Sequence, residues 1–469
     1  MNSETILQYR SSGGVLVPGV SDWVAMISPS TSDVSDCPLS SLQYKQTGDL
    51  SSLPLLCHYP VKAQYVNNDP DYISCKKKEC KEHNNKGECV VSTCSGSLSF
   101  HVINIRTDIE FVFFTAGFDT PCILKRSVPL KFANPKQPLY GHLSSIDSTA
   151  TSMRLTWVSG DKEPQQVQYG GGKSQTSQVT TFSPDNMCSS SILPSPAKDF
   201  GWHDPGYIHS AVMTGLKPSS TFSYRYGSPV ASQVSYMTAI GNHERDYVDS
   251  GSVYTTPDSG GECGVPYETY FPMPTPAKDK PWYSIEQGPV HFTVISTEHD
   301  WSQNSEQYDW MNKDMASVDR SKTPWIIFAG HRPMYSSSSG ILPSVDNNFV
   351  QAVEPLLLAN KVDLVLFGHV HNYERTCAVY QNECKAMPKK DGHGIDTYDN
   401  TNYSAPVQVV IGMAGFNLDK SPASADSWSL ARISEFGYVR VHATRQDLTF
   451  EYVNANTRKV EDSFRITKS

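Results

Sequence analysis

Three apolar segments of this 469-residue chain each end in a glycine that is followed at once by asparagine or histidine. They run into the sequences GNHE at 241–244, GH at 330–331 and GHVH at 368–371. In an open α/β sheet, the carboxyl ends of the strands meet at one crevice. The repetition therefore predicts an α/β domain in which four histidines and one asparagine lie close together.

The residue types in these loops indicate a metal centre. Neutral imidazole nitrogens and an amide oxygen are suitable ligands for Zn, Fe or Mn, and the preceding glycines let the backbone turn and approach a compact site. A single histidine after a strand is more often a structural residue. Three such loops, one of them with His-x-His spacing, favour a metal site over satisfied core histidines.

The sequence from 233 to 469 alternates apolar strands with helical stretches, which is typical of an α/β domain. The predicted strands contain VSYMTAI (234–240), VHFTVIST (290–297), PWIIFA (324–329), VDLVLF (362–367) and VQVVIG (407–412). Residues 304–318 predict a helix whose core face carries Tyr308, Met311, Met315 and Val318. The tail, 436–466, alternates apolar and polar residues in three runs, which predicts antiparallel strands.

The upstream sequence predicts two β-rich domains. Short apolar and alternating segments separated by polar loops indicate an N-terminal β-rich domain over 1–135. A proline-punctuated break at 134–138 precedes strands at sandwich-like spacing, so we place a β-sandwich over 136–232 and the α/β domain over 233–469. The sequence GGGKS at 170–174 is a weak P-loop match, because Val167 occupies the first required glycine position.

Eleven cysteines indicate disulfide bonds and an oxidising compartment. Four of them, Cys75, Cys80, Cys89 and Cys94, lie close together in one loop, and we expect disulfides there. The alternative is a zinc knuckle built from two C-x4-C pairs, but no histidine completes a recognised zinc pattern. Spacing does not fix the pairing of Cys263, Cys377 and Cys384.

The formal net charge of −9 disfavours binding to nucleic acid or to an anionic membrane surface. No apolar run approaches the roughly 20 residues that span a bilayer, which predicts a soluble chain. The first residues show none of the three parts of a secretory signal. Residues 402–404 form a glycosylation sequon at Asn402, which is compatible with secretion.

The sequences GNHE, GH, and GHVH followed by NYER (372–375) are similar to the later metal-binding blocks of purple acid phosphatases. Residues 216–226 resemble the late strand of a fibronectin type III domain, and the whole domain order resembles the large plant members of that family. The resemblance implies a secreted acid phosphatase that hydrolyses phosphate esters with Fe and Zn or Mn, and it makes a homodimer reasonable. It leaves the substrate open between phosphomonoesters, phosphodiesters and nucleotide pyrophosphates.

The same resemblance implies a role for each residue of the three loops. Asn242, His331 and His369 would bind the divalent metal, and His371 would bind the ferric iron. His243 would face the substrate phosphate as a cation or general acid.

Two further blocks of the family, GDxG and GDxxY, are missing from the chain. Its Gly-Asp pairs, Gly48-Asp49 and Gly160-Asp161, lie far upstream and have the wrong neighbours. The passage from Ser228 to Gln233 leaves no room for the last sandwich strand or the first catalytic strands. We infer that an internal segment is missing, and with it the residues that in the family bind iron and bridge the two metals.

The missing blocks predict a site with at most one metal and low or absent phosphatase activity. A bridging carboxylate normally screens two cations from each other, so its loss weakens binding of the second metal. The alternative is an inactive isoform that acts as a binding or regulatory protein. Removing strands from a sheet also exposes backbone edges, so the sequence predicts a tendency to aggregate.

Overall fold

The computed structural model describes residues 3–10, 21–32, 34, 60–115, 122–193, 195–199, 202–224, 233–338, 344–415, 417–422 and 426–468. The chain divides into two compact units, which we treat separately. Unit 1 comprises Met1–Pro138, Ser159–Lys162 and Ser195–Tyr207, and unit 2 comprises the remaining residues. None of the helices in the described part of the chain is long and apolar enough to cross a membrane.

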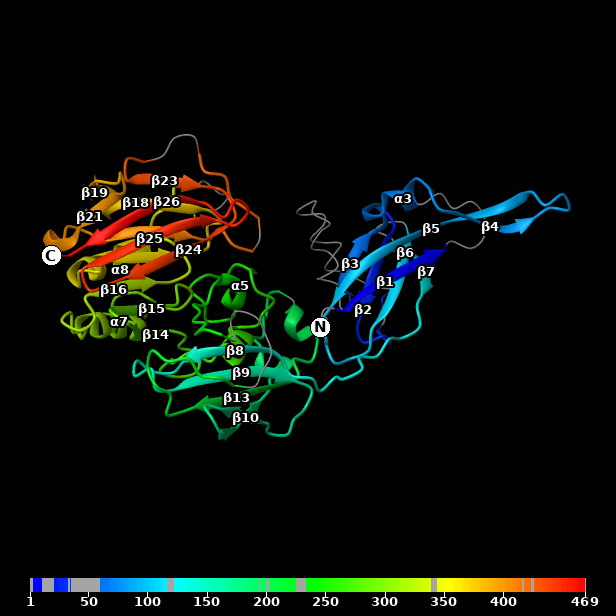
Figure 1. The fold of residues 1–469 in the computed structure, drawn as a ribbon, viewed down its shortest axis with the longest axis horizontal. Coiled ribbons are helices and arrows are strands. Elements are labelled where there is room, and N and C mark those ends of the chain that lie inside the picture. The colour runs from blue at the N-terminus through cyan, green and yellow to red at the C-terminus, as the bar shows by residue number, and fades with distance from the viewer. Residues whose placement is uncertain are drawn as a thin grey trace. The chain divides into compact units, whose positions relative to one another are not determined.

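Unit 1 is β-rich, as the sequence predicts (Figure 1). One sheet has the order β3 (Pro60–Tyr65), β2 (Trp23–Ile27), β6 (Glu110–Thr115), β7 (Cys122–Arg126), and the other has the order β1 (Ser3–Arg10), β5 (Cys89–Val102), β4 (Lys78–His83). Short helical turns are η1 (Val66–Asn68), α3 (Pro70–Ile73) and α4 (Pro196–Asp199). Alternate residues of β2, β5 and β6 form a core that includes Met26, Phe100 and Phe111.

The cysteine-rich loop of unit 1 is closed by disulfides, which confirms that prediction against the zinc alternative. Cys75 pairs with Cys94, and Cys80 pairs with Cys89 across the hairpin of β4 and β5. In unit 2, Cys188 pairs with Cys263 and Cys377 pairs with Cys384. These bonds settle the pairing that spacing alone left open.

The first part of unit 2 is a β-sandwich (Figure 1). Its four-stranded sheet has the order β12 (Gln178–Thr180), β13 (Tyr207–Met213), β9 (Met153–Ser159), β8 (Leu139–Ser145), and β10 (Gln166–Tyr169) pairs with β11 (Lys173–Thr176). The core contains Leu155, Trp157 and Met213. The three glycines of the GGGKS sequence, 170–172, form the turn between β10 and β11, and all three have positive φ. Lys173 and Ser174 belong to β11, so the sequence lies in a hairpin and not in a P-loop.

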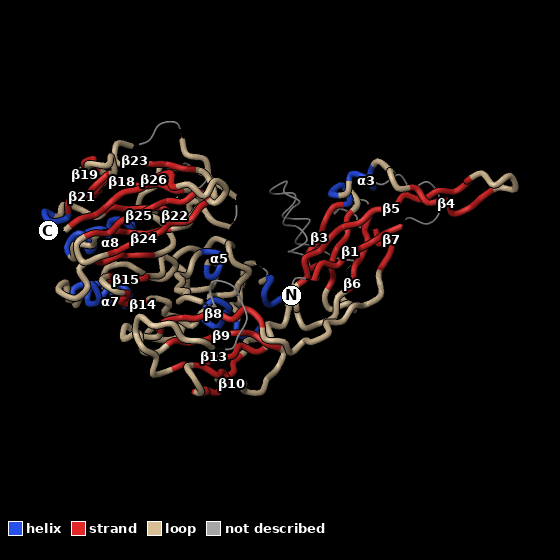
Figure 2. Tube along the Cα trace, viewed as in Figure 1, coloured by secondary structure: helices blue, strands red, loops and turns tan. Residues whose placement is uncertain are grey.

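The larger part of unit 2 contains an eight-stranded mixed sheet (Figure 2). Its order is β14 (Tyr283–Gln287), β15 (Val290–Val294), β16 (Trp325–Ala329), β17 (Leu364–Phe367), β22 (Val407–Ile411), β18 (Tyr373–Tyr380), β19 (Glu383–Ala386), and β23 (Ser429–Ile433) also pairs with β18. The central strands β15, β16, β17 and β22 run parallel. Four of the five predicted strands of the α/β domain are therefore present.

The predicted antiparallel tail is also present, as part of a second sheet. This sheet has the order β20 (Lys389–Lys390), β21 (Asp396–Asp399), β26 (Val460–Thr467), β25 (Asp447–Asn454), β24 (Gly437–Ala443), with η3 (Asn400–Asn402) after β21. Leu364 and Val409 of the first sheet join Phe450 and Phe464 of the second in one core. The two sheets thus bury their apolar faces together.

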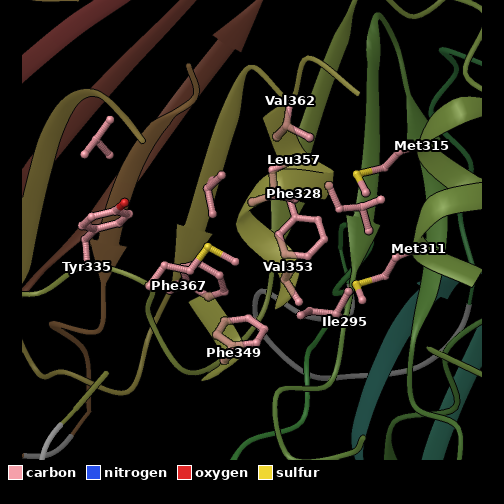
Figure 3. Packing of buried hydrophobic residues seen from close by; sticks show 14 of the residues in the cluster. Ile295, Met311, Met315, Phe328, Tyr335, Phe349, Val353, Leu357, Val362 and Phe367 are labelled. Carbon is pink, nitrogen blue, oxygen red and sulfur yellow. The ribbon is translucent and has the colours of Figure 1, made fainter. Parts of the chain in front are cut away.

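Two helices, α7 (Glu306–Ala316) and α8 (Asn347–Ala359), supply residues to the other core of this region (Figure 3). Met311 and Met315 are buried in it, and Tyr308 and Val318 pack against it, so the predicted helical core face is confirmed. The side chain of Ser305 accepts a hydrogen bond from the Tyr308 N–H and so caps the first turn of α7.

The fifth predicted strand, 234–240, is wrong. Only Ser235 makes an isolated bridge, to Leu143 of the sandwich, and Val234 and Tyr236 are 56% and 46% exposed. A strand needs a neighbour that satisfies its backbone N–H and C=O groups along its length. Strand β8 meets this segment only at Leu143, whose carbonyl accepts the N–H of Tyr236 at 2.8 Å, so no ladder forms. The late sandwich strand at 216–226 is also reduced to one bridge, Tyr169 to Tyr224, and its last two residues lie outside the described residues.

Among the described strands, β24 is at the edge of the second sheet, and its Tyr438 and Val441 are 52% and 40% exposed. An uncovered apolar edge strand is a template for pairing with another chain. We expect the purified protein to self-associate and Val441→Lys to reduce that association, as measured by size-exclusion chromatography with light scattering. Val128→Lys, at a 75% exposed position of unit 1, is the matched control and should have no effect. A wild-type profile with a single monomer peak would contradict the prediction.

Candidate metal centre

Two of the three predicted loops leave the sheet at neighbouring points. Strands β16 and β17 are parallel partners, with Ala329 opposite Leu366, so the loops that follow them begin side by side. His331 comes two residues after β16, and His369 comes two residues after β17. His369 has a φ of 62°, a left-handed conformation that is uncommon for a residue with a side chain and that often occurs at functional sites.

Asn242 reaches the same place from a single helical turn, α5 (Asn242–Arg245). The carboxylate of Glu244 accepts a hydrogen bond from the backbone N–H of Gly241 at 3.0 Å and closes this turn. Asp258 accepts a hydrogen bond from Nδ2 of Asn242 at 2.8 Å. This contact fixes the orientation of the amide, so that its oxygen faces His331.

Three potential metal-donor atoms converge where these loops meet. Nε2 of His331 lies 2.6 Å from Oδ1 of Asn242 and 3.1 Å from Nδ1 of His369. In a tetrahedral zinc site with bonds of about 2.0 to 2.1 Å, neighbouring donors are separated by roughly 3.3 Å. The 3.1 Å separation of the two imidazole nitrogens is close to that value, and the 2.6 Å separation of Nε2 of His331 from Oδ1 of Asn242 is shorter.

The hydrogen-bond chemistry of this trio also fits a cation. Arg332 Nη1 lies 3.3 Å from Nε2 of His369; if it donates there, the proton of His369 is on Nδ1 and points at His331. Nε2 of His331 must then accept, which leaves no proton for its 2.6 Å contact with Oδ1 of Asn242. An imidazole nitrogen has one in-plane position for either a proton or a lone pair, so protons alone leave one contact unsatisfied.

Burial keeps both imidazoles neutral. It lowers the pKa of His331 well below its usual range, and the neighbouring His369 and Arg332 act in the same direction. Burial, assisted by Arg332, lowers the pKa of His369 to about 4. Neutral imidazole is the form that binds metals.

Arg332 is the principal charged residue of the site, and the sequence patterns did not identify it. Its guanidinium lies 2.7 Å from a carboxylate oxygen of Asp246 and 3.0 Å from one of Glu298, both fully buried, and stacks 4.0 Å from the ring centroid of Tyr254. Burial raises the pKa of Glu298 to about 8, against the opposing effect of Arg332. Two sequence positions could have identified these residues. Arg332 directly follows His331, and Glu298 directly follows the predicted strand 290–297.

His243 and His371 lie near enough to the trio to help lower the pKa of both His331 and His369. His243 is exposed, and its Nδ1 lies 3.0 Å from the carbonyl of Asp258. The backbone N–H of His371 donates to Asp419 at 2.8 Å. Within the described ranges, no group of three or more His, Cys, Asp or Glu side chains is arranged to hold a metal. The structure thus brings together Asn242, His331 and His369.

Four family models match the chain in succession. They are an "Fn3-like domain from Purple Acid Phosphatase" at 14–134, "Purple acid Phosphatase, N-terminal domain" at 138–258, "Calcineurin-like phosphoesterase" at 204–373 and "Iron/zinc purple acid phosphatase-like protein C" at 405–463. Together with the fold and the loops described above, they define a calcineurin-like phosphoesterase with β-rich domains before it.

The relatives make this assignment specific. "Probable inactive purple acid phosphatase 27" of Arabidopsis thaliana is 31% identical, over 96% of this chain and 85% of the relative. "Probable inactive purple acid phosphatase 1" of the same plant is 30% identical, over 100% and 87%. The structure of purple acid phosphatase PPD1 from yellow lupin (Lupinus luteus) seeds matches with a TM-score of 0.82 at 28% identity, covering 100% of this chain and 93% of that one. The chain belongs to the purple acid phosphatase family.

One of these alignments supports a missing internal segment. The alignment with the second Arabidopsis relative extends over 580 residues, whereas this chain has 469, so at least 111 aligned positions have no counterpart here. The two family models at 138–258 and 204–373 also overlap across the junction between Ser228 and Gln233.

The close approach of Gly241 to His331 gives a test of the site. A Cβ at position 241 would lie 2.8 Å from Nδ1 of His331, so Gly241→Ala must displace the imidazole or the turn. We expect Gly241→Ala to lower the free energy of unfolding by about 1–3 kcal/mol, the usual effect of overpacking. Gly392→Ala, where an added Cβ meets nothing within 4 Å, is the control and should change it by less than about 0.5 kcal/mol. Urea denaturation measures both, and equal effects would contradict the prediction.

Asn372, directly after His371, is fully buried, and neither polar atom of its side chain has a hydrogen-bond partner among the described residues. A buried unsatisfied amide costs free energy that a side chain of similar shape without polar atoms avoids. We expect Asn372→Leu to raise the free energy of unfolding by about 1 kcal/mol. Asn372→Asp, which buries a charge, should lower it. A destabilised Asn372→Leu variant in thermal and urea denaturation would overturn this interpretation.

Proposed function

We propose that this chain retains the divalent half of a purple acid phosphatase site, binds one metal ion there, and hydrolyses phosphate esters slowly or not at all. The observation that carries the proposal is the convergence of Oδ1 of Asn242, Nε2 of His331 and Nδ1 of His369 at 2.6 and 3.1 Å. The donor set, two neutral imidazoles and one amide oxygen, suits Zn or Mn.

Each residue of the site would have a distinct role. Asn242, His331 and His369 would hold the ion, and Asp258 would keep the amide oxygen of Asn242 directed at it. His243, which is exposed, would contact the phosphate of the substrate. A divalent ion in such a site supplies positive charge to phosphate oxygens and lowers the pKa of a bound water.

The position that binds iron in the family would have too few ligands in this chain. His371 remains, but the GDxG and GDxxY blocks that would supply its partners are absent from the sequence. Three relatives carry the words "probable inactive" in their names at 29–31% identity, which supports a loss of activity here too. These names equally favour the second candidate function, a binding or regulatory protein with one structural metal.

Several properties of the family are proposed for this chain with the function. The disulfides Cys75–Cys94 and Cys80–Cys89 support secretion, and the exposed Asn402 supports glycosylation. A phosphate ester as ligand, a homodimer, and domain boundaries at 135 and 232 complete the proposal.

Metal titration tests whether Asn242, His331 and His369 bind an ion while His371 does not contribute. We expect isothermal titration of the metal-free protein to give one Zn²⁺ per chain, and His331→Ala, His369→Ala or Asn242→Ala to weaken binding by at least about tenfold, because each removes one of three ligands. His371→Ala is the matched control and should leave the affinity unchanged. Turnover of an aryl phosphate should stay below about 1 per second, the lower end of ordinary enzyme rates.

Other results of these measurements would contradict the proposal in different ways. Two metals per chain with turnover on the order of 1 to 1,000 per second would show that other residues replace the lost aspartates. Binding that is insensitive to His331→Ala would place the metal elsewhere and refute the proposed site. No metal and no turnover would refute the proposed site and leave a binding or regulatory protein without a structural metal.

A further inference from the structure

A cleft of about 530 Å³ lies within unit 2, between the β-sandwich and helix α6 (Val265–Tyr270). We call it the sandwich–α6 cleft. Its floor is one face of the sheet, formed by residues at every second position of β12, β13 and β9. They are Gln178, Thr180, Ile208, Ser210, Val212 and Arg154. The intervening residues, Leu155, Trp157, Ala211 and Met213, point into the sandwich core, as the two-residue period of a strand requires.

The opposite wall comes from the catalytic region. Val265, Glu268 and Thr269 of α6 line it, followed by Pro272 and Lys278. None of the lining residues belongs to the candidate metal centre. The volume falls within the range of about 300–1,000 Å³ that is usual for ligand sites, which occur preferentially where two domains meet.

The two walls are joined by covalent and polar links. Cys188 follows the rim of the sandwich side and is bonded to Cys263, two residues before α6. The backbone N–H of Cys188 donates to the carbonyl of Gly261 at 3.0 Å, and Nη1 of Arg154 donates to the carbonyl of Pro272 at 2.7 Å. A cleft whose walls are fixed before a ligand arrives loses less conformational entropy on binding.

The polar groups of the floor are neutral and available. Gln178, Thr180 and Ser210 make no side-chain hydrogen bond within the described part of the chain, and together they present amide and hydroxyl groups in a row across β12 and β13. On the same face, Ile208 lies opposite Thr180 but is only 1% exposed, so the accessible aliphatic surface comes from Val212, two residues after Ser210. Neutral donors and acceptors beside small apolar surfaces match a ligand that has many hydroxyl groups and apolar C–H faces.

The charged residues of the cleft do not form an anion site. The guanidinium of Arg154 is held by the carbonyl of Pro272, and Lys278 is an exposed side chain at the rim. The carboxylate of Glu268, on the α6 wall, accepts the backbone N–H of Asp279 at 2.9 Å and 3.1 Å and would repel an anion. Phosphate, sulfate and nucleotides are therefore poor ligands for this surface.

We propose that the sandwich–α6 cleft binds a short, uncharged oligosaccharide. The ring oxygens and hydroxyls of the sugar would pair with Gln178, Thr180 and Ser210, and a C–H face would lie on Val212. This site is independent of metal binding and of phosphate-ester hydrolysis.

The test titrates metal-free full-length protein with four uncharged probes, cellotetraose, xylotetraose, mannotriose and maltotetraose, by calorimetry and ligand-observed NMR. We expect saturable binding of at least one probe. Gln178→Ala should weaken that binding by about tenfold, since it removes hydrogen bonds to the ligand. Ser210→Phe, which fills the floor of the cleft, should abolish it. Gln446→Ala, at an exposed position outside the cleft, is the matched control and should have no effect.

Three results would overturn the proposal. They are no binding of any of the four probes, binding that Gln178→Ala and Ser210→Phe leave unchanged, and tighter binding of glucose 6-phosphate or inorganic phosphate than of every neutral sugar. If Ser210→Phe does not fold, Gln178→Ala still decides, because Gln178 is an exposed residue and its loss leaves no cavity. Because the protein is free of metal, failure here leaves the proposed phosphoesterase site untouched, and failure of metal binding leaves this one untouched.

Discussion

The parallel pairing of β16 with β17 is the constraint on which the candidate metal centre depends. Because Ala329 is opposite Leu366, the loops after the two strands start at the same edge of the sheet. A glycine then turns each backbone, and His331 and His369 come within 3.1 Å of each other. A shift of one residue in this register would turn the side chains at that edge to opposite faces of the sheet. The position of the site thus depends first on the pairing of β16 with β17, which places His331 and His369 side by side.

The segment before Asn242 lacks such continuous strand pairing. Residues 234–240 have the composition of a strand, but they meet strand β8 at a single bridge, Ser235 to Leu143, so they reach Asn242 without regular secondary structure. Asn372 is buried without a partner at the same end of the domain. Both features agree with the loss of an internal segment at the junction between Ser228 and Gln233, whereas the loops that carry His331 and His369 keep the strands that support them.

Much of the fold could be predicted from local pattern, because the relevant forces are local or repeat along the chain. The helix around Met311 and Met315, the tail strands, and the loops that carry His331 and His369 all follow from apolar periodicity and glycine placement. The segment 234–240 was assigned wrongly because strand formation depends on a neighbour that the sequence pattern cannot supply. Arg332, Glu298 and Asp246 were missed for a related reason: their importance comes from mutual burial and charge pairing between loops distant in sequence.

The disulfide between Cys188 and Cys263 encloses the junction between Ser228 and Gln233 in a covalent ring with a sequence separation of 75. The closure entropy of such a ring changes only with the logarithm of its length. If all of the at least 111 unmatched positions had lain inside it, their removal would alter the entropy of closure by less than about 1 kcal/mol. Shortening the chain inside the ring therefore changes the stabilisation by the Cys188–Cys263 disulfide very little. The sandwich and the catalytic region can remain joined by this bond while the segment between them is lost.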